Sequence, residues 1–189
     1  MKSMCAESVP KLSRVILSEE EIQLGVNRLA KQITRDYKNK NPMVVGVLTG
    51  ALFFTCDLIR RIETPLELDF MSLRHFNPKN PDSSHVEITK DLENSIEGRE
   101  VLIVEDLVDT GLSLHYLCQV LGQRRPASMG ICSLLARPKL RLVDLPLRYR
   151  GFSIDEQFLV GYGLDFQGYF RNLSYLASLK ENSKASRVA

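Results

Sequence analysis

Cysteine and histidine are scarce in this chain, with four cysteines and three histidines among 189 residues. Cys5, Cys56, Cys118 and Cys132 lie far apart, without C-x-x-C spacing. This pattern argues against a zinc site and against a disulfide framework, because both need closely spaced or paired cysteines. The expected compartment is therefore a reducing one, most simply the cytoplasm.

Long apolar runs and an excess of one charge are also missing. The apolar runs fall far short of the roughly 18 residues that a membrane-spanning helix needs. Residues 1–17 hold no continuous apolar segment after Lys2, so no secretion signal is expected. Because 25 basic residues stand against 23 acidic ones, no overall field draws the chain onto nucleic acid. Neither a membrane nor nucleic acid is expected as a partner, and any polyanion must be bound locally.

What the chain does contain is enough apolar material for one domain with a buried core. It is 44% hydrophobic and 25% charged over 189 residues. We expect a single domain, 1–189, with its core at about residues 15–176. The segment 177–189 is polar towards its end and is expected to be a flexible tail.

Short strand patterns alternate with helical patterns along the chain. Ser18 and Glu21 form a capping-box signature, and the apolar residues that follow recur at helical spacing. The expected helices are 18–37, 51–62 and 113–124, and the expected strands are 43–48, 66–73, 86–92, 101–104 and 127–136. Such strand-to-helix units predict a parallel sheet covered on both faces, with ligands at the carboxyl ends of its strands. The segment 74–85, "RHFNPKNPDSSH", is rich in Pro, Asn and Ser and predicts an exposed, mobile loop.

One stretch stands out chemically, namely "VLIVEDLVDTGLSL" at residues 101–114. Glu105 and Asp106 offer carboxylate oxygens, which suit vicinal sugar hydroxyls or a hydrated magnesium ion. The following "DTGLS" offers a glycine turn, two hydroxyls and a helix start, which suit a phosphate monoester. A phosphorylated ribose carries both groups. The alternatives are a strand that ends in solvated acids before a helix capped by Thr or Asp, and an aspartyl-phosphate site, for which a strand-end D-x-D is missing.

This stretch resembles the phosphoribosyl-pyrophosphate signature of the type I phosphoribosyltransferases, and most closely that of the hypoxanthine-guanine phosphoribosyltransferases. "SLLARP", "GFSIDEQFLVGYGLDF" and "YFRNL" follow in the order and at about the spacing of that family. The resemblance covers most of residues 15–176. It implies an α/β fold with a central, mainly parallel sheet flanked by helices, a flexible loop, and a small hood built from N- and C-terminal segments.

The resemblance also implies roles for single residues on the phosphoribosyl side of the site. Glu105 and Asp106 would hold the ribose hydroxyls, directly or through Mg²⁺, and Asp165 would coordinate a second Mg²⁺. The residues that would cradle the 5'-phosphate are Thr110, Gly111, Leu112 and Ser113. The residues that would contact pyrophosphate are Thr49, Gly50 and Arg171. Taken alone, Arg171 would be read as a solvated surface arginine.

On the purine side, the resemblance places Asp109 under the purine N7, as a general base or as the partner of a protonated N7. Phe158 would stack on the base, and the backbone of Leu159 would contact the edge of the base. Arg137 would meet the purine 6-oxygen, and Asp165 would lie on this side as well. Taken alone, Phe158 would be read as an ordinary core aromatic.

The sequence departs from the family pattern in three respects. Thr49 stands where the family usually has Lys or Arg, so a charged pyrophosphate contact becomes neutral. His75 and Phe76 stand where the mobile loop, here about residues 74–86, usually begins Ser-Tyr. Arg137 replaces a lysine, and its wider planar head leaves the choice among hypoxanthine, guanine and xanthine open.

The sequence thus supports two hypotheses. The first is a magnesium-dependent 6-oxopurine phosphoribosyltransferase of purine salvage, which would use phosphoribosyl pyrophosphate and a purine base. The family implies a homodimer or homotetramer. The second is a nucleotide-binding regulator or weakly active pseudoenzyme on the same fold, motivated by Thr49 and the His75-Phe76 pair.

Overall fold

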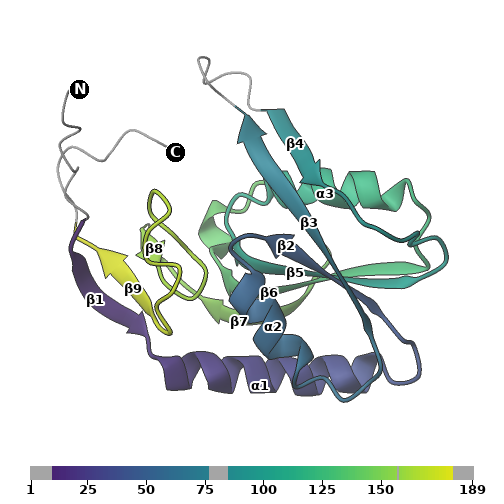
Figure 1. Ribbon diagram of the computed structural model, residues 1–189, viewed down its shortest axis with the longest axis horizontal. Helices are drawn as coiled ribbons and strands as arrows, with labels where there is room; N and C mark the ends of the chain where they lie inside the picture. The colour runs from purple at the N-terminus through teal and green to yellow at the C-terminus, as the bar shows by residue number, and fades with distance from the viewer. Residues whose placement is uncertain (1–9, 77–84, 157, 181–189) are drawn as a thin grey trace, which may run out of the picture.

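A computed structural model describes residues 10–76, 85–156 and 158–180 of the chain. Its strands form one sheet of six and one of three (Figure 1). The strands of the larger sheet, in the spatial order β4-β3-β2-β5-β6-β7, are β4 (His85–Lys90), β3 (Glu67–Phe76), β2 (Met43–Leu48), β5 (Glu100–Val108), β6 (Ser128–Ala136) and β7 (Leu147–Ser153). All neighbours are parallel except β3 and β4, which confirms the predicted mainly parallel sheet.

Helices cover both faces of this sheet, as predicted. Helices α1 (Glu19–Asp36) and α2 (Leu52–Ile59) lie on one face, and α3 (Leu112–Gly122) lies on the other (Figure 1). Successive side chains of a strand point to opposite faces. In β5, Leu102 therefore packs into the core under α1 and α2, whereas Ile103 packs into the core under α3. Among the described residues, no helix is long and apolar enough to cross a membrane.

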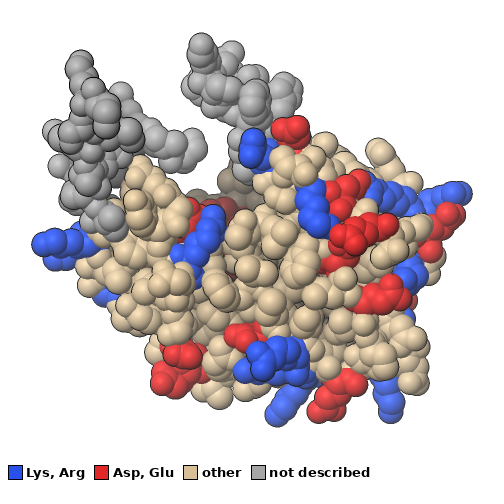
Figure 2. All heavy atoms as spheres, viewed as in Figure 1, with Lys and Arg blue, Asp and Glu red and all other residues tan. Residues whose placement is uncertain are grey.

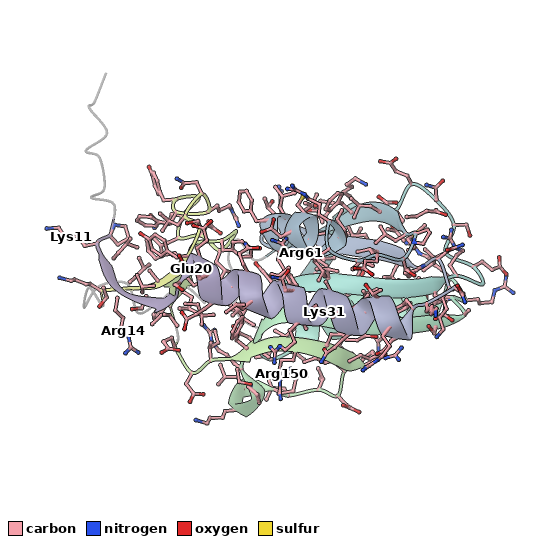
Figure 3. All side chains as sticks on the ribbon, turned by 90° about the horizontal axis from the view of Figure 1, so that it is seen from below. Lys11, Arg14, Glu20, Lys31, Arg61 and Arg150 are labelled. Carbon is pink, nitrogen blue, oxygen red and sulfur yellow. The ribbon has the colours of Figure 1, made fainter. Side chains whose placement is uncertain are left out.

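Helix α1 begins where its capping box predicted. The Ser18 Oγ accepts a hydrogen bond from the backbone N–H of Glu21 at 3.2 Å, and the Glu21 carboxylate accepts one from the Ser18 N–H at 2.8 Å. Its buried stripe consists of Ile22, Gly25, Val26, Leu29, Ala30 and Ile33. Seen from below, α1 crosses the sheet, and charged residues such as Glu20 and Lys31 lie on its exposed side (Figure 3).

The three-stranded sheet joins the two ends of the chain and forms the hood that the resemblance implied. It consists of β1 (Leu12–Leu17), β9 (Leu176–Leu179) and β8 (Leu159–Val160), in that spatial order and antiparallel throughout. It stands beside the large sheet, at the left of Figure 1. Residues 177–179, expected in a flexible tail, belong to β9 because backbone pairing with β1 and β8 orders them. The tail residues 181–189 lie outside the described part of the chain.

The expected loop at residues 74–85 is shorter than its composition indicated. Residues 74–76 continue β3, residue 85 begins β4, and the register pairs Arg74 with Glu87 and Phe76 with His85. An antiparallel edge pair can carry polar side chains because one face meets solvent, so composition alone misplaced the strand ends. The prediction of a mobile loop falls on residues 77–84, which lie outside the described residues.

Strand β5 also runs further than the apolar run 101–104 indicated. It continues to Val108, so Glu105 and Asp106 lie within a strand and not in a loop after it. The pairing with β2 ends where Gly46 meets Val104, whereas the pairing with β6 continues to Val108. Strand β5 thus carries its two acids past the end of its pairing with β2. The remaining short helix is the 3₁₀ turn η1 (Pro138–Leu140), which follows β6.

Candidate active site

A cavity of about 620 Å³ opens at the carboxyl ends of β2 and β5. Three loops meet there, namely the turn after β2, the loop between β5 and α3, and the loop between β8 and β9. The predicted site residues that line it are Gly50, Glu105, Asp106, Asp109, Thr110, Gly111, Ser113, Asp165 and Arg171. Acidic and basic atoms lie side by side in the hollow between the hood and the large sheet (Figure 2).

The floor of the cavity carries the two adjacent acids of β5. Asp106 is only 8% exposed, and its Oδ1 accepts a hydrogen bond from the Leu107 N–H at 2.7 Å. Burial raises the pKa of the Asp106 carboxyl. Burial, together with the neighbouring charge of Asp106, holds the pKa of Glu105 well above its ordinary value. In the unliganded chain, ionising both Glu105 and Asp106 therefore costs free energy.

The turn after β2 can approach Asp106 only because it contains a glycine. A Cβ atom on Gly50 would lie 1.7 Å from the Asp106 Oδ2. A cis peptide bond joins Leu48 to Thr49 in this turn. The Thr49 side chain is exposed and does not line the cavity, whereas Gly50 does. Of the predicted Thr49-Gly50 pair, the structure thus brings only Gly50 to the cavity.

The loop between β5 and α3 presents the start of a helix to the cavity. The N-cap of α3 is Gly111, with a φ of +83°, and no side chain caps the helix there. The residue before the N-cap still contacts the helix start, because the Thr110 Oγ1 accepts a hydrogen bond of 3.4 Å from the Leu112 N–H. Helix starts offer backbone N–H groups and a positive dipole end, which suit an anion. Thr110 and Ser113 line the cavity beside this turn, whereas Leu112 is 52% exposed and does not.

Asp109 and Arg137 form an ion pair at the side of the cavity. The Arg137 Nη1 lies 2.8 Å from each carboxylate oxygen of Asp109. The side chain of Arg137 is only 7% exposed, whereas that of Asp109 is 40% exposed. Arg137 follows the last residue of β6 and does not line the cavity itself. In this structure Arg137 is therefore connected to the cavity by its ion pair with Asp109, which does line it.

The loop between β8 and β9 brings a second ion pair to the opposite edge of the cavity. The Arg171 Nη2 lies 2.6 Å from the Asp165 Oδ1, and its Nη1 donates to the Gly163 carbonyl at 2.5 Å. The Asp165 Oδ2 accepts from the Gly168 N–H at 2.6 Å. Arg171 is thus a cavity residue held in place by two partners, and the reading of it as a solvated surface arginine is wrong.

Besides Arg137, two further predicted purine contacts do not line the cavity, namely Phe158 and Leu159. Phe158 is 44% exposed, so it is not the core aromatic that its residue type alone indicated. Leu159 is buried and pairs with Ser178 in the hood sheet. His75 and Phe76 belong to β3, but their side chains lie outside the described residues.

Several apolar residues of the cavity wall were not predicted from the sequence. Leu48, Leu73 and Leu164 line the cavity but carry no chemical signature. Leu48 and Leu164 adjoin predicted site residues in the chain. Leu73 lies one position before the segment that was expected to be a loop, so the true extent of β3 would have revealed it.

No three His, Cys, Asp or Glu side chains gather into a ready-made metal site in the described ranges. The cavity instead offers the carboxylates of Glu105 and Asp106 on its floor and that of Asp165 at its edge. A donor set of one or two carboxylates, completed by water and substrate oxygens, is the arrangement that Mg²⁺ commonly adopts. The residues present therefore fit magnesium better than they fit a metal that needs a complete protein cage.

Comparison with known proteins identifies the family. Residues 15–167 match the family model described as "Phosphoribosyl transferase domain". The chain is also 43% identical over 169 residues to a hypoxanthine-guanine phosphoribosyltransferase of Bacillus subtilis (strain 168). The matched segment covers 89% of this chain and 94% of that relative. The chain belongs to the phosphoribosyltransferase family.

Within that family, similar solved structures are hypoxanthine phosphoribosyltransferases. One from Staphylococcus aureus superimposes with a TM-score of 0.85 at 41% identity, covering 89% of this chain and 92% of that chain. One from Trypanosoma cruzi, in complex with the product IMP, superimposes with a TM-score of 0.82 at 35% identity, covering 89% of this chain and 95% of that chain. These structures confirm the predicted fold.

The crowded acids of β5 lead to a prediction about stability. Because the pKa of Glu105 is higher in the folded than in the unfolded chain, this group favours folding most below its unfolded pKa, and that contribution is lost as pH rises through the folded pKa. Glu105→Gln should therefore raise the free energy of unfolding at pH 7.5 by about 1 kcal/mol or more, since one pKa unit corresponds to about 1.4 kcal/mol. The gain should shrink as the pH falls towards 4.

Urea denaturation of the unliganded protein at both pH values measures this effect. Glu87→Gln, at an exposed position of β4, is the matched control and should change little at either pH. A Glu105→Gln protein less stable than the wild type at pH 7.5 would show that the crowding of acids carries no cost.

Proposed function

We infer that this chain is a purine-salvage enzyme that transfers the 5-phosphoribosyl group from phosphoribosyl pyrophosphate to a 6-oxopurine. The products are a nucleoside monophosphate and pyrophosphate. The observation that carries this inference is that Glu105 and Asp106 of β5, the start of α3 and Asp109 line one cavity together. The hypoxanthine and hypoxanthine-guanine phosphoribosyltransferases to which the chain is similar support the same reaction.

The phosphoribosyl half of the substrate would occupy the side of the cavity nearest β5. Glu105 and Asp106 would accept hydrogen bonds from the ribose hydroxyls or hold them through Mg²⁺. The residues 110–113 would surround the 5'-phosphate with hydroxyls and backbone N–H groups. The raised pKa values of Glu105 and Asp106 support this placement, because donors or cations in the ligand would relieve the repulsion between them.

The pyrophosphate half would lie between Gly50 and the loop that carries Asp165 and Arg171. A guanidinium group suits paired phosphate oxygens, and the missing Cβ of Gly50 permits close approach of backbone. Asp165 would hold a second magnesium ion. When bound, magnesium would supply positive charge to the leaving pyrophosphate. Since Thr49 faces solvent, its replacement of the usual basic residue leaves the Gly50 backbone as the contact on this side.

The purine would lie against Asp109, which is 40% exposed at the cavity. Asp109 would accept a proton from N7 or stabilise a protonated N7. Arg137 would hold Asp109 in place while its guanidinium faces the 6-oxygen. Phe158 would stack on the base and the Leu159 backbone would contact its edge, and the exposure of Phe158 leaves its ring accessible for this. His75 and Phe76, at the end of β3, would cover the ligand.

The reaction is a displacement at the anomeric carbon of ribose, in which a purine nitrogen forms the new bond as pyrophosphate leaves. Positive charge develops on the ribose and negative charge on the pyrophosphate. Carboxylates on the floor of the cavity and Arg171 at its edge face these charges from fixed positions. Electrostatic preorganisation is therefore the main contribution that the chain makes to this reaction.

The same proposal includes a cytoplasmic location and a homodimer or homotetramer. Free thiols at Cys56, Cys118 and Cys132 support a reducing compartment. Large exposed apolar side chains such as Leu24 and Leu142 support burial against further copies of the chain.

The direct test is to incubate the purified protein with phosphoribosyl pyrophosphate, Mg²⁺ and each of hypoxanthine, guanine and xanthine. We expect nucleoside monophosphate from hypoxanthine and at least one rate difference among the three bases. Product is measured by chromatography, with an assay lacking Mg²⁺ as the control. If no base yields nucleotide while nucleotide still binds, the chain is a nucleotide-binding regulator on the same fold.

Asp109→Asn should lower turnover by about 100-fold or more, because general acid–base groups commonly contribute 10²- to 10⁴-fold. Affinity for the nucleoside monophosphate should stay within about threefold, since Asn keeps one acceptor for Arg137. Asp91→Asn is the matched control, because Asp91 also binds an arginine, Arg124, through both oxygens but lies outside the cavity. Steady-state kinetics and calorimetry separate the two effects, and an unchanged turnover would remove Asp109 from the chemistry.

Arg137→Lys should change the ratio of kcat/KM for hypoxanthine to that for xanthine. Lysine offers a single point donor, so it cannot keep the contact with both Asp109 oxygens and also face the base as arginine does. We expect a change of about threefold or more, in line with the energy of one altered hydrogen bond. Arg150→Lys, at an exposed position of β7, is the control, and an equal ratio in both variants would reject a role of Arg137 in base choice.

A further inference from the structure

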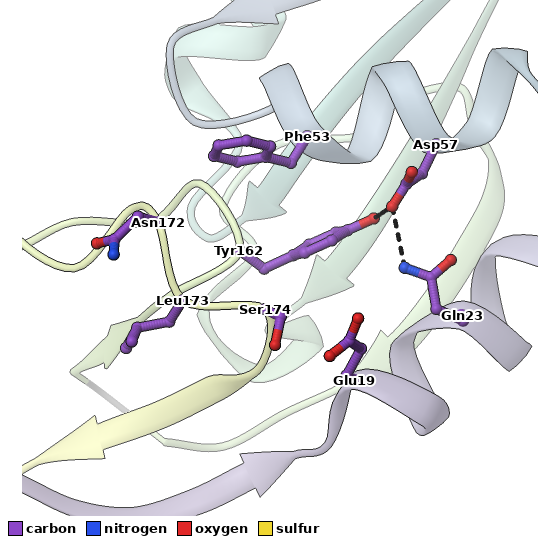
Figure 4. A pocket seen from close by; sticks show the side chains of 8 residues that line it. All are labelled: Glu19, Gln23, Phe53, Asp57, Tyr162, Asn172, Leu173 and Ser174. Atoms are coloured by element: carbon purple, nitrogen blue, oxygen red, sulfur yellow. Dashed lines mark hydrogen bonds between the residues drawn. The ribbon is translucent and has the colours of Figure 1, made fainter.

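Tyr162 lies in the loop that forms one edge of the cavity, yet its side chain points to the other side of that loop. It enters a second, smaller cavity of about 220 Å³, between this loop and the helices α1 and α2 (Figure 4). There the Tyr162 hydroxyl donates a hydrogen bond of 2.6 Å to the Oδ2 of Asp57 on α2. The same oxygen accepts from the Nε2 of Gln23 on α1 at 2.9 Å. The side chain therefore ties the loop to both helices.

The acceptor of this hydrogen bond is itself held in place. The Arg61 Nη1 donates to the Asp57 carbonyl at 2.7 Å, and its Nη2 donates to the Gln23 Oε1 at 2.6 Å. Tyr162 is only 5% exposed, and its ring lies 6.4 Å from that of Phe53. Burial, together with the hydrogen bond to Asp57, raises the pKa of Tyr162, so the hydroxyl remains a donor at neutral pH. Each part of the contact is thus restrained.

The backbone around Tyr162 is tightly bent. Gly161, Tyr162 and Gly163 have φ values of +102°, +46° and +101°. A left-handed backbone costs a residue with a side chain of order 1 kcal/mol or more. The buried ring and its hydrogen bond offset that cost at Tyr162.

This bend places Gly163 directly on Gly50. A Cβ atom on Gly163 would lie 2.0 Å from the Gly50 carbonyl oxygen. The Gly163 carbonyl in turn accepts from Arg171, which pairs with Asp165 at the edge of the main cavity. Gly50 lies just before α2, the helix that carries Asp57. A closed ring of covalent and non-covalent contacts results. It runs from Gly50 along α2 to Asp57, across the hydrogen bond to Tyr162, and through Gly163 back to Gly50.

We propose that Tyr162 is a positioning residue for the pyrophosphate half of the site, and that it acts through its hydrogen bond to Asp57. The ring sets the separation between Gly50 and the edge formed by Asp165 and Arg171. The Asp109–Arg137 pair on the purine side lies outside this ring, because the two residues follow the ends of β5 and β6. This inference rests on the proposed phosphoribosyl transfer and extends it to residues outside the main cavity.

Tyr162→Phe removes only the hydroxyl and tests the inference directly. The KM for phosphoribosyl pyrophosphate should rise roughly fivefold or more, since a hydrogen bond to a charged acceptor is lost and small misplacements of binding groups weaken a site. The KM for hypoxanthine should stay within about twofold. Both constants are measured in the forward reaction with saturating Mg²⁺, and thermal unfolding of each variant is recorded alongside.

Tyr149→Phe is the matched control. The Tyr149 hydroxyl also donates to an aspartate, the Oδ2 of Asp36, at 3.1 Å, and Tyr149 is 3% exposed, but this pair lies outside both cavities. We expect it to lower the unfolding temperature without changing either KM. If Tyr149→Phe and Tyr162→Phe raise the KM for phosphoribosyl pyrophosphate equally, the effect is one of general stability and the proposal fails.

Asp57 provides a second, independent arm. Asp57→Ala removes the acceptor and should reproduce the Tyr162→Phe effect, whereas Asp57→Asn keeps a side-chain oxygen and should lie closer to the wild type. The double variant Tyr162→Phe/Asp57→Ala should be no worse than Asp57→Ala alone. Strictly additive effects, or equal effects on both substrates, would overturn the proposal. An inactive wild-type protein would instead contradict the phosphoribosyl transfer itself, so the two failures are distinguishable.

Discussion

The contact between Asp106 and Gly50 is the constraint on which the cavity depends. Strand β5 continues past its last pairing with β2 and carries two adjacent acids, and the turn after β2 packs against the second one. A Cβ atom on Gly50 would lie 1.7 Å from the Asp106 carboxylate, and one on Gly163 would lie 2.0 Å from the Gly50 carbonyl. The end of β5, the turn at Gly50 and the loop at Gly163 are distant in the chain. They can pack this closely only because Gly50 and Gly163 have no side chains. The floor and one edge of the cavity result from this stacking.

The charges of the cavity match those that the proposed ligand, with its anionic and hydroxyl groups, would need. Two arginines at the site are paired with carboxylates, Arg137 with Asp109 and Arg171 with Asp165. The acids on the floor, by contrast, have raised pKa values because they are buried beside one another. The two ion pairs hold their charged groups in fixed positions. The crowded acids, by contrast, would be stabilised by a bound cation or hydroxyl donor. On the proposed function, stability given up in the unliganded chain would become affinity for the ligand, which is a common arrangement at functional sites.

Much of the fold could be predicted because local patterns agreed with the tertiary structure. The continuous apolar run 43–48 became β2 with those same limits, and the capping box at Ser18 marked the start of α1. The patterns failed where pairing with another strand decided the outcome. Residues 74–76 are polar or aromatic but pair with β4, and Glu105 is acidic but pairs with Ser133 of β6. The hood strands β1 and β9 lie at opposite ends of the chain, so no local signal relates them.

The sequence by itself determined the chemical inventory of this protein: paired acids, a glycine turn before a helix, and the residue types that could meet a phosphorylated ribose and a base. These follow from residue identity and spacing, which need no tertiary contact to be read. Only the tertiary structure decided which groups act together. It turned Thr49 to solvent and Gly50 to the cavity, bound Arg137 to Asp109, and directed Tyr162 away from the cavity onto Asp57. The physical reason is that side-chain direction and ion pairing depend on neighbours brought together by folding, and these neighbours are remote in sequence.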